Sequence, residues 1–350
     1  MTMTCIGLDL AKNVFQVHGV DERGKTVFSK KISRPQLLSF FAALPPCLIG
    51  MEACSGANHW ARKLKELGHE PRLISPQFVK PYVKSNKTDR NDAEAICEAV
   101  SRPSMRFVPV KTVAQQDIQA IHRVRERLVG SKVALTNQIR GILAEYGIVV
   151  AQQITQLRRR LPEILEDADN GLNAQERELL AELSEQWRQT EAWIATYDRR
   201  LQRIYAANEA CQRLGEIEGI GPLTATALVA AAGDAQVFKN GRQMAAWLGL
   251  VPRQHSSGGK PRLLGISKRG DRYLRTLLVH GARSALARCG GKPDPRSRWL
   301  QKLRVRRHHN VAAVALANKN ARIAWAILAH GERYRRPVVD AVRAAASTAN

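Results

Sequence analysis

Strand-type and helix-type patterns alternate along the first hundred residues in an order that few folds accommodate. Residues 14–20 alternate in the two-residue period of a half-buried strand, and a turn ending at Gly24 follows them. Short apolar runs predict four more strands, at residues 5–10, 26–32, 47–52 and 71–75. Helix signals, with Pro at starts or Gly and Pro after ends, predict helices at residues 35–44, 58–67, 76–83 and 92–100.

Three antiparallel strands followed by alternating helices and strands are the order of an RNase H-like α/β fold. In that fold the first and fourth strands are neighbours, which would place Asp9 beside Glu52. Asp89 and Asp92 lie three residues apart at a predicted helix start and so share one helical face. Four converging carboxylates repel one another unless they bind hard cations, so the pattern predicts a Mg²⁺ site, with Mn²⁺ as a substitute.

A purely structural interpretation of these acids stays open at this point. Asp89 suits a helix N-cap, and Asp92 suits the positive end of a helix. Asp9 is harder to explain in this way, because an acid between Leu8 and Leu10 in a central strand is costly to bury without a partner.

Long helices follow the α/β region. Residues 112–146 and 174–208 carry apolar residues at helical spacing, and the polar segment 152–171 between them is interrupted by Pro162. We expect an extended hairpin or coiled-coil arm that acts in dimerisation or as a spacer. Trp187, Trp193 and Tyr197 are interpreted as packing residues rather than base-stacking platforms.

A Gly-Ile-Gly turn at Gly219 and Gly221, followed by an apolar helix, matches the helix-hairpin-helix pattern. Such a turn exposes backbone N–H groups to a DNA phosphate, although a tight interhelical turn explains the same glycines. A glycine-rich stretch then carries two hydroxyls, Ser256 and Ser257, among basic residues. The basic residues are Arg253, Lys260, Arg262, Lys268, Arg269, Arg272 and Arg275.

This basic stretch is open to two interpretations. A hydroxyl held among cations can attack a phosphodiester, whereas a flexible basic loop merely touches a nucleic-acid backbone. Between residues 253 and 307 there are sixteen Lys or Arg and two acids. The whole chain has 55 Lys and Arg against 31 Asp and Glu, a net charge of +24, which favours a nucleic-acid partner over a membrane.

The six scattered cysteines form no CxxC pair, so free thiols in a reducing compartment are expected. No apolar run reaches the length of a membrane span, and residues 1–30 lack a signal-peptide pattern. We therefore expect a soluble, cytoplasmic protein.

Seven motifs together resemble the DEDD transposases of the insertion sequence 110 family, and its 1111 subgroup in particular. They are IGLDLAK at 6–12, IGME at 49–52, DRNDAE at 89–94, IEGIGP at 217–222, GLVPR at 249–253, SSGGK at 256–260 and ISKRGD at 266–271. The resemblance spans nearly the whole chain. It implies a RuvC-like domain in which Asp9, Glu52, Asp89 and Asp92 bind Mg²⁺, and a transposase domain in which Ser257 is the nucleophile.

The resemblance also implies partners and an organisation into domains. Family members recombine DNA under the guidance of a structured bridge RNA, as multimers in which one subunit's acids meet another's serine; a dimer or tetramer is expected. The expected divisions are a RuvC-like domain at 1–108, a helical arm at 109–210, a mainly helical transposase domain at 211–335 and a flexible tail at 336–350.

The sequence thus predicts a DNA recombinase in which Ser257 forms a transient phosphoserine link to DNA. The alternative is a metal-dependent junction-resolving endonuclease that cuts with water and forms no covalent intermediate. A non-enzymatic architectural protein with a degenerate acid cluster is a third interpretation.

Overall fold

The computed structural model describes residues 3–86 and 88–335, which divide into two compact units. The first unit comprises residues 3–113 with the short segment 232–237, and the second holds the other described residues. The predicted tail at 336–350 lies outside the described residues. Along the described parts of the chain, no helix is both long enough and apolar enough to cross a membrane.

A six-stranded mixed sheet forms the centre of the first unit, with the order β3-β2-β1-β4-β5-β6. Its strands are β1 Met3–Asp9, β2 Val14–Asp21, β3 Thr26–Ser33, β4 Leu48–Glu52, β5 Glu70–Ile74 and β6 Phe107–Val108. β1, β2 and β3 are antiparallel, and β4 and β5 continue the sheet parallel to β1. The predicted meander and the predicted contact between the first and fourth strands are confirmed. The two-residue β6 was too short to be predicted from a pattern.

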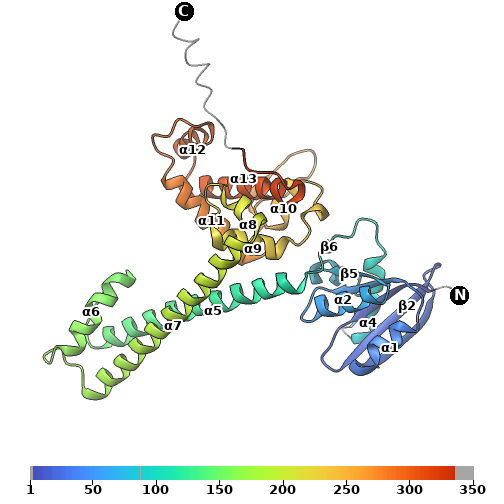
Figure 1. Cartoon of the computed structure of the whole chain (residues 1–350), viewed down its shortest axis with the longest axis horizontal. Helices are drawn as coiled ribbons and strands as arrows, with labels where there is room; N and C mark the ends of the chain where they lie inside the picture. The colour runs from blue at the N-terminus through green and yellow to red at the C-terminus, as the bar shows by residue number, and fades with distance from the viewer. Residues whose placement is uncertain (1–2, 87, 336–350) are drawn as a thin grey trace, which may run out of the picture. The chain divides into compact units, whose positions relative to one another are not determined.

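Helices cover both faces of this sheet (Figure 1). They are α1 Leu37–Ala42, α2 Ala57–Glu66, α3 Pro76–Val79 and α4 Asp89–Val100, with 3₁₀ turns at Arg34–Gln36 and Lys80–Tyr82. Ile6 and Leu8 of β1 pack with α1 and α2, whereas Cys5 packs with α4 on the opposite face. This mixed sheet with its helices fits the predicted RNase H-like fold.

Two glycines allow α4 to lie unusually close to the sheet. Gly7 of β1 and Gly50 of β4 are paired in register. A Cβ atom added to Gly7 would lie 2.0 Å from the carbonyl oxygen of Ala93, and one added to Gly50 would lie 2.8 Å from Cβ of Val100. Backbone atoms of α4 at Gly7, and the Val100 side chain of α4 at Gly50, therefore occupy the space that side chains at these positions would fill.

A helical arm begins the second unit. Its helices are α5 Val113–Glu145, α6 Ile154–Glu166 and α7 Ala174–Ala207. The prediction of an interrupted segment at 152–171 is wrong, because α6 includes Pro162. The apolar face of α6, formed by Leu157, Leu161 and Ile164, packs with residues of α5 and α7 in one core cluster, and this packing outweighs the hydrogen bond that proline removes.

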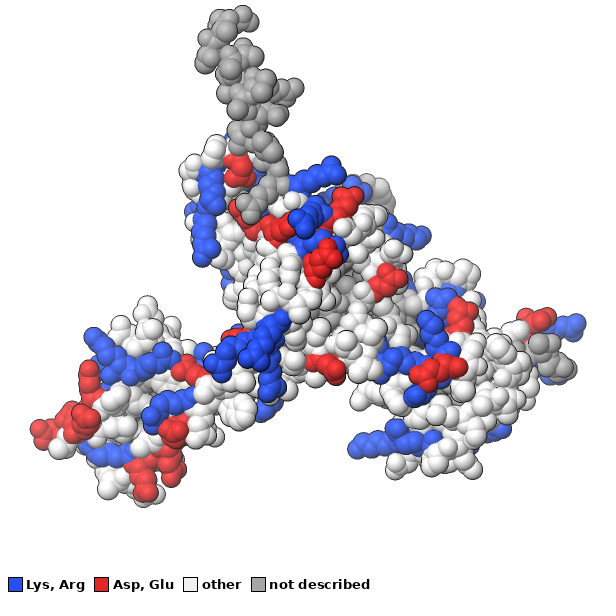
Figure 2. Space-filling view, viewed as in Figure 1, with Lys and Arg blue, Asp and Glu red and all other residues white. Residues whose placement is uncertain are grey.

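The aromatic residues of α7 differ in their environments. Trp187 is buried in the core cluster of the arm, as predicted. Trp193 is 55% exposed, so its interpretation as a packing residue is wrong. In Figure 2, acidic and basic side chains are mixed over the far end of the arm, and a basic cluster covers its middle. A regular coiled-coil seam remains a prediction.

The rest of the second unit is mainly helical, with one short hairpin. Its helices are α8 Glu209–Gly215, α9 Pro222–Ala232, α10 Gly241–Trp247, α11 Arg272–Ala287, α12 Pro295–Arg306 and α13 His309–His330. Strands β7 Pro252–Gln254 and β8 Leu263–Ile266 form the hairpin. α13 is rich in alanine and packs against α10 and α11, which bury one face of it. All six cysteines are free, as predicted, and all but Cys54 are buried.

We predict that Gly7→Ala disrupts the contact between α4 and the sheet. The new methyl group would collide with the backbone of α4, which cannot give way as a flexible side chain can, so the local opening free energy should fall by about 3 kcal/mol. Hydrogen–deuterium exchange of β1 and α4 peptides measures this loss of protection. Gly130→Ala in α5 is the matched control, because an added Cβ there meets nothing within 4 Å. In this variant, the amides of α5 should be protected from exchange at least as well as in the wild type. Unchanged exchange in Gly7→Ala would contradict the close-packing argument.

Candidate functional site

Two of the four predicted acids lie at neighbouring strand ends. Asp9 ends β1 and Glu52 ends β4, one residue beyond the register pair Leu8 and Met51. Side chains alternate between the faces of a sheet, so Asp9 shares the face of Gly7, and Glu52 shares the face of Gly50. That face is the one on which α4 packs.

The other two acids lie in the first turn of α4. Thr88 is the N-cap, and its hydroxyl accepts a hydrogen bond from the backbone N–H of Asn91 at 3.2 Å. The interpretation of Asp89 as the N-cap is therefore wrong, because a hydroxyl already satisfies that role. Asp89 is exposed and Asp92 is half-buried. The N-cap therefore uses neither carboxylate, although both lie in the first turn of α4, where the positive end of the helix favours acids.

The four carboxylates act on one another electrostatically. Burial is the largest cause that raises the pKa of Asp9 to about 6, and the negative charges of Asp92, Asp89 and Glu52 raise it further. Within the described residues, however, no three His, Cys, Asp or Glu side chains are close enough together to hold a metal ion. The two observations agree physically, because charge repulsion acts over a longer range than coordination. The donor set, carboxylate oxygen alone, suits Mg²⁺, but the side chains would have to close around the ion.

We predict a pH-dependent stabilisation by Asp9→Asn in the absence of divalent cations. The folded-state pKa of Asp9 lies above its ordinary value, so this group costs stability as the pH rises from about 4 through 6, and its full cost applies above that range. With allowance for solvent screening, the variant should be about 1–2 kcal/mol more stable than the wild type at pH 7.5, and equal to it near pH 4. Urea denaturation at both pH values measures the difference. An equal gain at both values would show that the ionised Asp9 carboxylate, with its burial and the repulsion from its neighbours, is not the cause.

The predicted serine loop is an ordered β-hairpin. β7 and β8 pair as antiparallel strands, and Ser257 and Lys260 form a bridge at the tip, where the Lys260 N–H donates to the Ser257 carbonyl at 3.1 Å. The two residues between them, Gly258 and Gly259, have φ angles of 55° and 73°. Two consecutive positive φ angles are typical of a type I′ turn, which explains both glycines by backbone geometry.

The two serines of this hairpin differ in what their hydroxyls do. The Ser256 oxygen accepts hydrogen bonds from Nε2 of Gln254 at 2.8 Å and from the backbone N–H of Arg262 at 3.3 Å. Among the hydrogen bonds found in the described residues, none uses the hydroxyl of Ser257, which is exposed at the tip. Ser256 therefore braces the hairpin, while Ser257 has a hydroxyl available for another group.

Most of the predicted phosphate-binding cations are exposed around this hairpin. They are Arg253, Lys260, Arg262, Lys268, Arg269 and Arg272. Arg275 differs, because it is half-buried and its Nη1 donates to the carbonyls of Leu248 and Gly270 at 3.2 and 3.1 Å. Its guanidinium holds the turn that precedes α11, which is a structural task.

The Gly-Ile-Gly turn joins α8 to α9, and its two glycines have different surroundings. Gly219 has a φ of 92°, and a Cβ added there would lie 2.8 Å from the carbonyl oxygen of Gly281 in α11. The adjacent Glu218 carbonyl accepts hydrogen bonds from Arg296 at 2.6 Å and Asn320 at 3.0 Å. Gly221 is exposed, and an added Cβ would meet nothing within 4 Å. Packing thus explains Gly219, and phosphate binding by the turn remains a prediction.

We predict that substitution of these two glycines separates stability from binding. Gly219→Ala strains a left-handed residue against α11 and should cost about 2–3 kcal/mol. Gly221→Ala should change stability by less than about 1 kcal/mol. Thermal unfolding tests both, and DNA affinity at fixed salt then tests whether Gly221→Ala weakens binding without unfolding the turn. Equal stability losses would refute the difference between the two positions.

A buried polar network in the second unit could not be predicted from the sequence. His122 of α5 lies 2.9 Å from the Tyr273 hydroxyl of α11 and 3.0 Å from the Thr226 hydroxyl of α9. Burial lowers the pKa of His122 to about 4, so the imidazole is neutral. The network lies beside a cavity of about 350 Å³. His122 is 104 residues from Thr226 and 151 residues from Tyr273 in the chain, so only the tertiary fold brings the three together.

Comparison with known proteins shows similarity over nearly the whole chain. The family described as "Transposase IS116/IS110/IS902 family" matches residues 211–299, and a DEDD family of IS110 type, described as "Transposase", matches residues 6–148. A "Probable family 20 transposase" of Pseudomonas aeruginosa is 55% identical over 96% of this chain and 99% of its own length. The "Transposase for insertion sequence element IS1111A" of Coxiella burnetii is 50% identical, covering 94% and 91%. The "Transposase for insertion sequence element IS1328" of Yersinia enterocolitica is 45% identical, covering 94% and 98%.

Proposed function

Because the chain belongs to the IS110 family of insertion-sequence transposases, we propose that it cuts and rejoins DNA with Ser257 as the nucleophile. The observation that carries the assignment of the serine is the contrast within the hairpin. Ser256 is committed to two hydrogen bonds, whereas Ser257 presents its hydroxyl at an exposed tip.

In the proposed step the Ser257 oxygen attacks a DNA phosphorus atom. A serine–phosphate bond forms, the bond from phosphorus to one DNA oxygen breaks, and the proton of the serine hydroxyl ends on that leaving oxygen or on solvent. Attack by a DNA hydroxyl on the phosphoserine reverses the step and joins the new ends. The energy of the phosphodiester is kept in the covalent link, so rejoining needs no external energy source.

The exposed cations around the hairpin supply the counter-charge for this phosphate. Arg253, Lys260 and Arg262 belong to the hairpin itself, and Lys268, Arg269 and Arg272 follow it in the chain. Cations placed where charge develops stabilise a transition state most when water is excluded. We therefore expect DNA binding to exclude water from the hairpin and these cations, so that the cations stabilise the transition state at the bound phosphate.

The carboxylates of Asp9, Glu52, Asp89 and Asp92 are the proposed ligands of Mg²⁺, or of Mn²⁺ in its place. When bound, such an ion lowers the pKa of a coordinated oxygen and neutralises charge on a leaving oxygen. The raised pKa of Asp9 supports this role, because the cluster repels itself without a cation. The acids belong to the first unit and Ser257 to the second, so the reaction needs both units at one phosphate, within one chain or between copies.

The proposal includes two further partners. A structured guide RNA would select the DNA, and self-association as a dimer or tetramer would assemble the acids with the serine. Both rest on the family to which the chain belongs.

We predict that Ser257→Ala abolishes the covalent protein–DNA adduct trapped on a suicide DNA substrate. Denaturing electrophoresis with labelled DNA measures the adduct, which should fall at least about a hundredfold because no other hydroxyl occupies the tip. Ser256→Ala is the matched control and should retain an adduct, reduced in proportion to the loss of bracing in the hairpin. An adduct that persists in Ser257→Ala and disappears in Ser256→Ala would reassign the nucleophile. Cleaved DNA without an adduct in the wild type would favour the junction-resolving endonuclease.

A further inference from the structure

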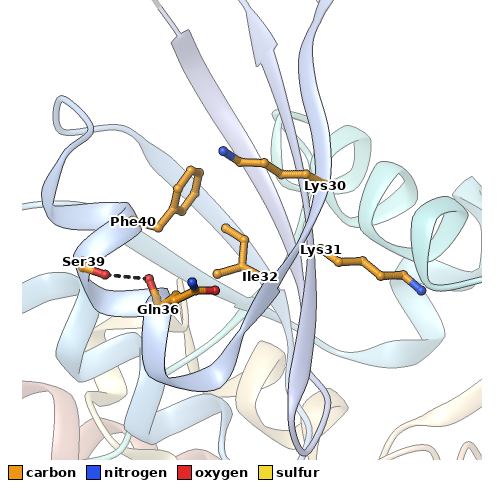
Figure 3. Close-up of a pocket in the computed structure, with 6 residues that line it drawn as sticks. All are labelled: Lys30, Lys31, Ile32, Gln36, Ser39 and Phe40. Atoms are coloured by element: carbon orange, nitrogen blue, oxygen red, sulfur yellow. Dashed lines mark hydrogen bonds between the residues drawn. The ribbon is translucent and has the colours of Figure 1, made fainter.

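A pocket of about 400 Å³ lies between the edge strand β3 and helix α1 in the first unit, beside the sheet and away from the acids on the α4 face (Figure 3). Its volume falls in the range of small-ligand sites in proteins. Phe40 and the largely buried Ile32 form its apolar wall, and Lys30, Lys31, Gln36 and Ser39 also line it. None of these residues takes part in the proposed chemistry.

Lys30 is held in place by aromatic rings. Its ammonium nitrogen lies 4.4 Å from the ring centroid of Phe40 and 5.5 Å from that of Phe28, and these two rings pack edge to face. The Phe28 ring in turn lies over Gly19 of the neighbouring strand, where an added Cβ would be 2.7 Å away. The sheet therefore leaves room for an aromatic support beneath the cation.

A lysine on an edge strand often serves only to prevent sheet-to-sheet aggregation. Lys31 fits that role, because in Figure 3 it points away from Phe40. Lys30 instead lies along the pocket. Among the ion pairs of residues 3–86 and 88–335, none involves Lys30, so its charge has no acidic partner within these described residues.

The polar groups at the rim favour a ligand rich in hydrogen-bond acceptors. The Gln36 side-chain oxygen accepts a hydrogen bond from the Ser33 hydroxyl at 2.6 Å, which leaves its NH₂ group as a donor. The Ser39 hydroxyl donates to the Gln36 carbonyl at 3.0 Å, as the dashed line in Figure 3 shows. The pocket thus offers an ammonium group and an amide NH₂ beside an apolar wall.

The charge around the pocket suits a polyanion rather than a neutral ligand. Residues 23–51 include five Lys or Arg and no Asp or Glu. A cation beside an aromatic side chain is an arrangement by which proteins bind single-stranded nucleic acid, with phosphates on the cations and bases against the rings.

We propose that this pocket binds one nucleotide of a single-stranded nucleic acid, with its base against Phe40 and a phosphate on Lys30. The inference rests on the proposed function only in that the protein acts on nucleic acid. It adds a binding surface on the first unit that is separate from both the acids and the serine hairpin. The strand is a segment of RNA or of unpaired DNA, since both present the same phosphate and base chemistry.

Photocrosslinking of the full-length protein tests the proposal. Short oligo(U) and oligo(dT) strands that carry a photoreactive 4-thio pyrimidine are irradiated with the protein, and the modified peptide is identified by mass spectrometry. We expect an adduct within β3 or α1. Phe40→Leu and Lys30→Gln should each lower its yield at least about fivefold, because one stacking or phosphate contact is lost. Lys65→Gln, an exposed position on α2 with the same change of charge, should leave this adduct unchanged.

The outcomes distinguish RNA from DNA as the bound strand, and they test the pocket separately from the proposed function. An adduct with oligo(U) alone identifies RNA, one with oligo(dT) alone identifies DNA, and adducts with both identify the shared chemistry. Two results would overturn the proposal that the pocket binds a nucleotide. One is the absence of an adduct in β3 and α1 with either strand, and the other is an adduct yield that neither Phe40→Leu nor Lys30→Gln changes. Lys30→Gln keeps the test valid if Phe40→Leu fails to fold. The covalent adduct on suicide DNA, measured on the same preparations, reports the proposed function independently.

Discussion

The contact between α4 and the sheet at Gly7 and Gly50 is the constraint on which the acidic cluster depends. Side chains at these two paired positions would collide with α4, so glycine alone permits the observed packing. Two residues further along the same face of each strand come Asp9 and Glu52, and the first turn of α4 carries Asp89 and Asp92. A looser contact would move the helix start away from the strand ends and weaken the negative field of the other acids, which adds to burial in raising the pKa of Asp9.

The two halves of the proposed chemistry are prepared in different ways. The acids are held on elements of a sheet and a helix but repel one another, so the proposed chemistry assigns a cation the task of bringing them together. The serine is placed by backbone geometry alone, on a tip where consecutive glycines close a tight turn. In the proposed chemistry, a serine on a short exposed hairpin becomes an effective nucleophile only when a phosphate and its counter-charges surround it, which would couple the reaction to assembly on DNA.

Much of the fold of the first unit could be predicted because its strands and helices follow local patterns, whereas the roles of the site residues remain predictions. The period of the strands and the stop signals of the helices gave the order of the first unit, and the order implied that Asp9 and Glu52 are neighbours. Predictions failed where tertiary contacts decide. Pro162 suggested a break, yet the apolar face of α6 found partners on α5 and α7. Asp89 suggested a cap, yet Thr88 one residue earlier took the hydrogen bond.

The sequence by itself determined the order of the strands along the first unit and the basic character of the serine stretch, because each follows from residues close together in the chain. Only the tertiary structure decided that the Ser256 hydroxyl is engaged in hydrogen bonds and that Gly219 is required by packing. It also decided that the Lys30 ammonium lies near the rings of Phe40 and Phe28. These facts depend on which atoms occupy the space around a residue. A linear pattern specifies the periodicity of burial, but the neighbours across a sheet or between helices are set by the packing of segments distant in sequence.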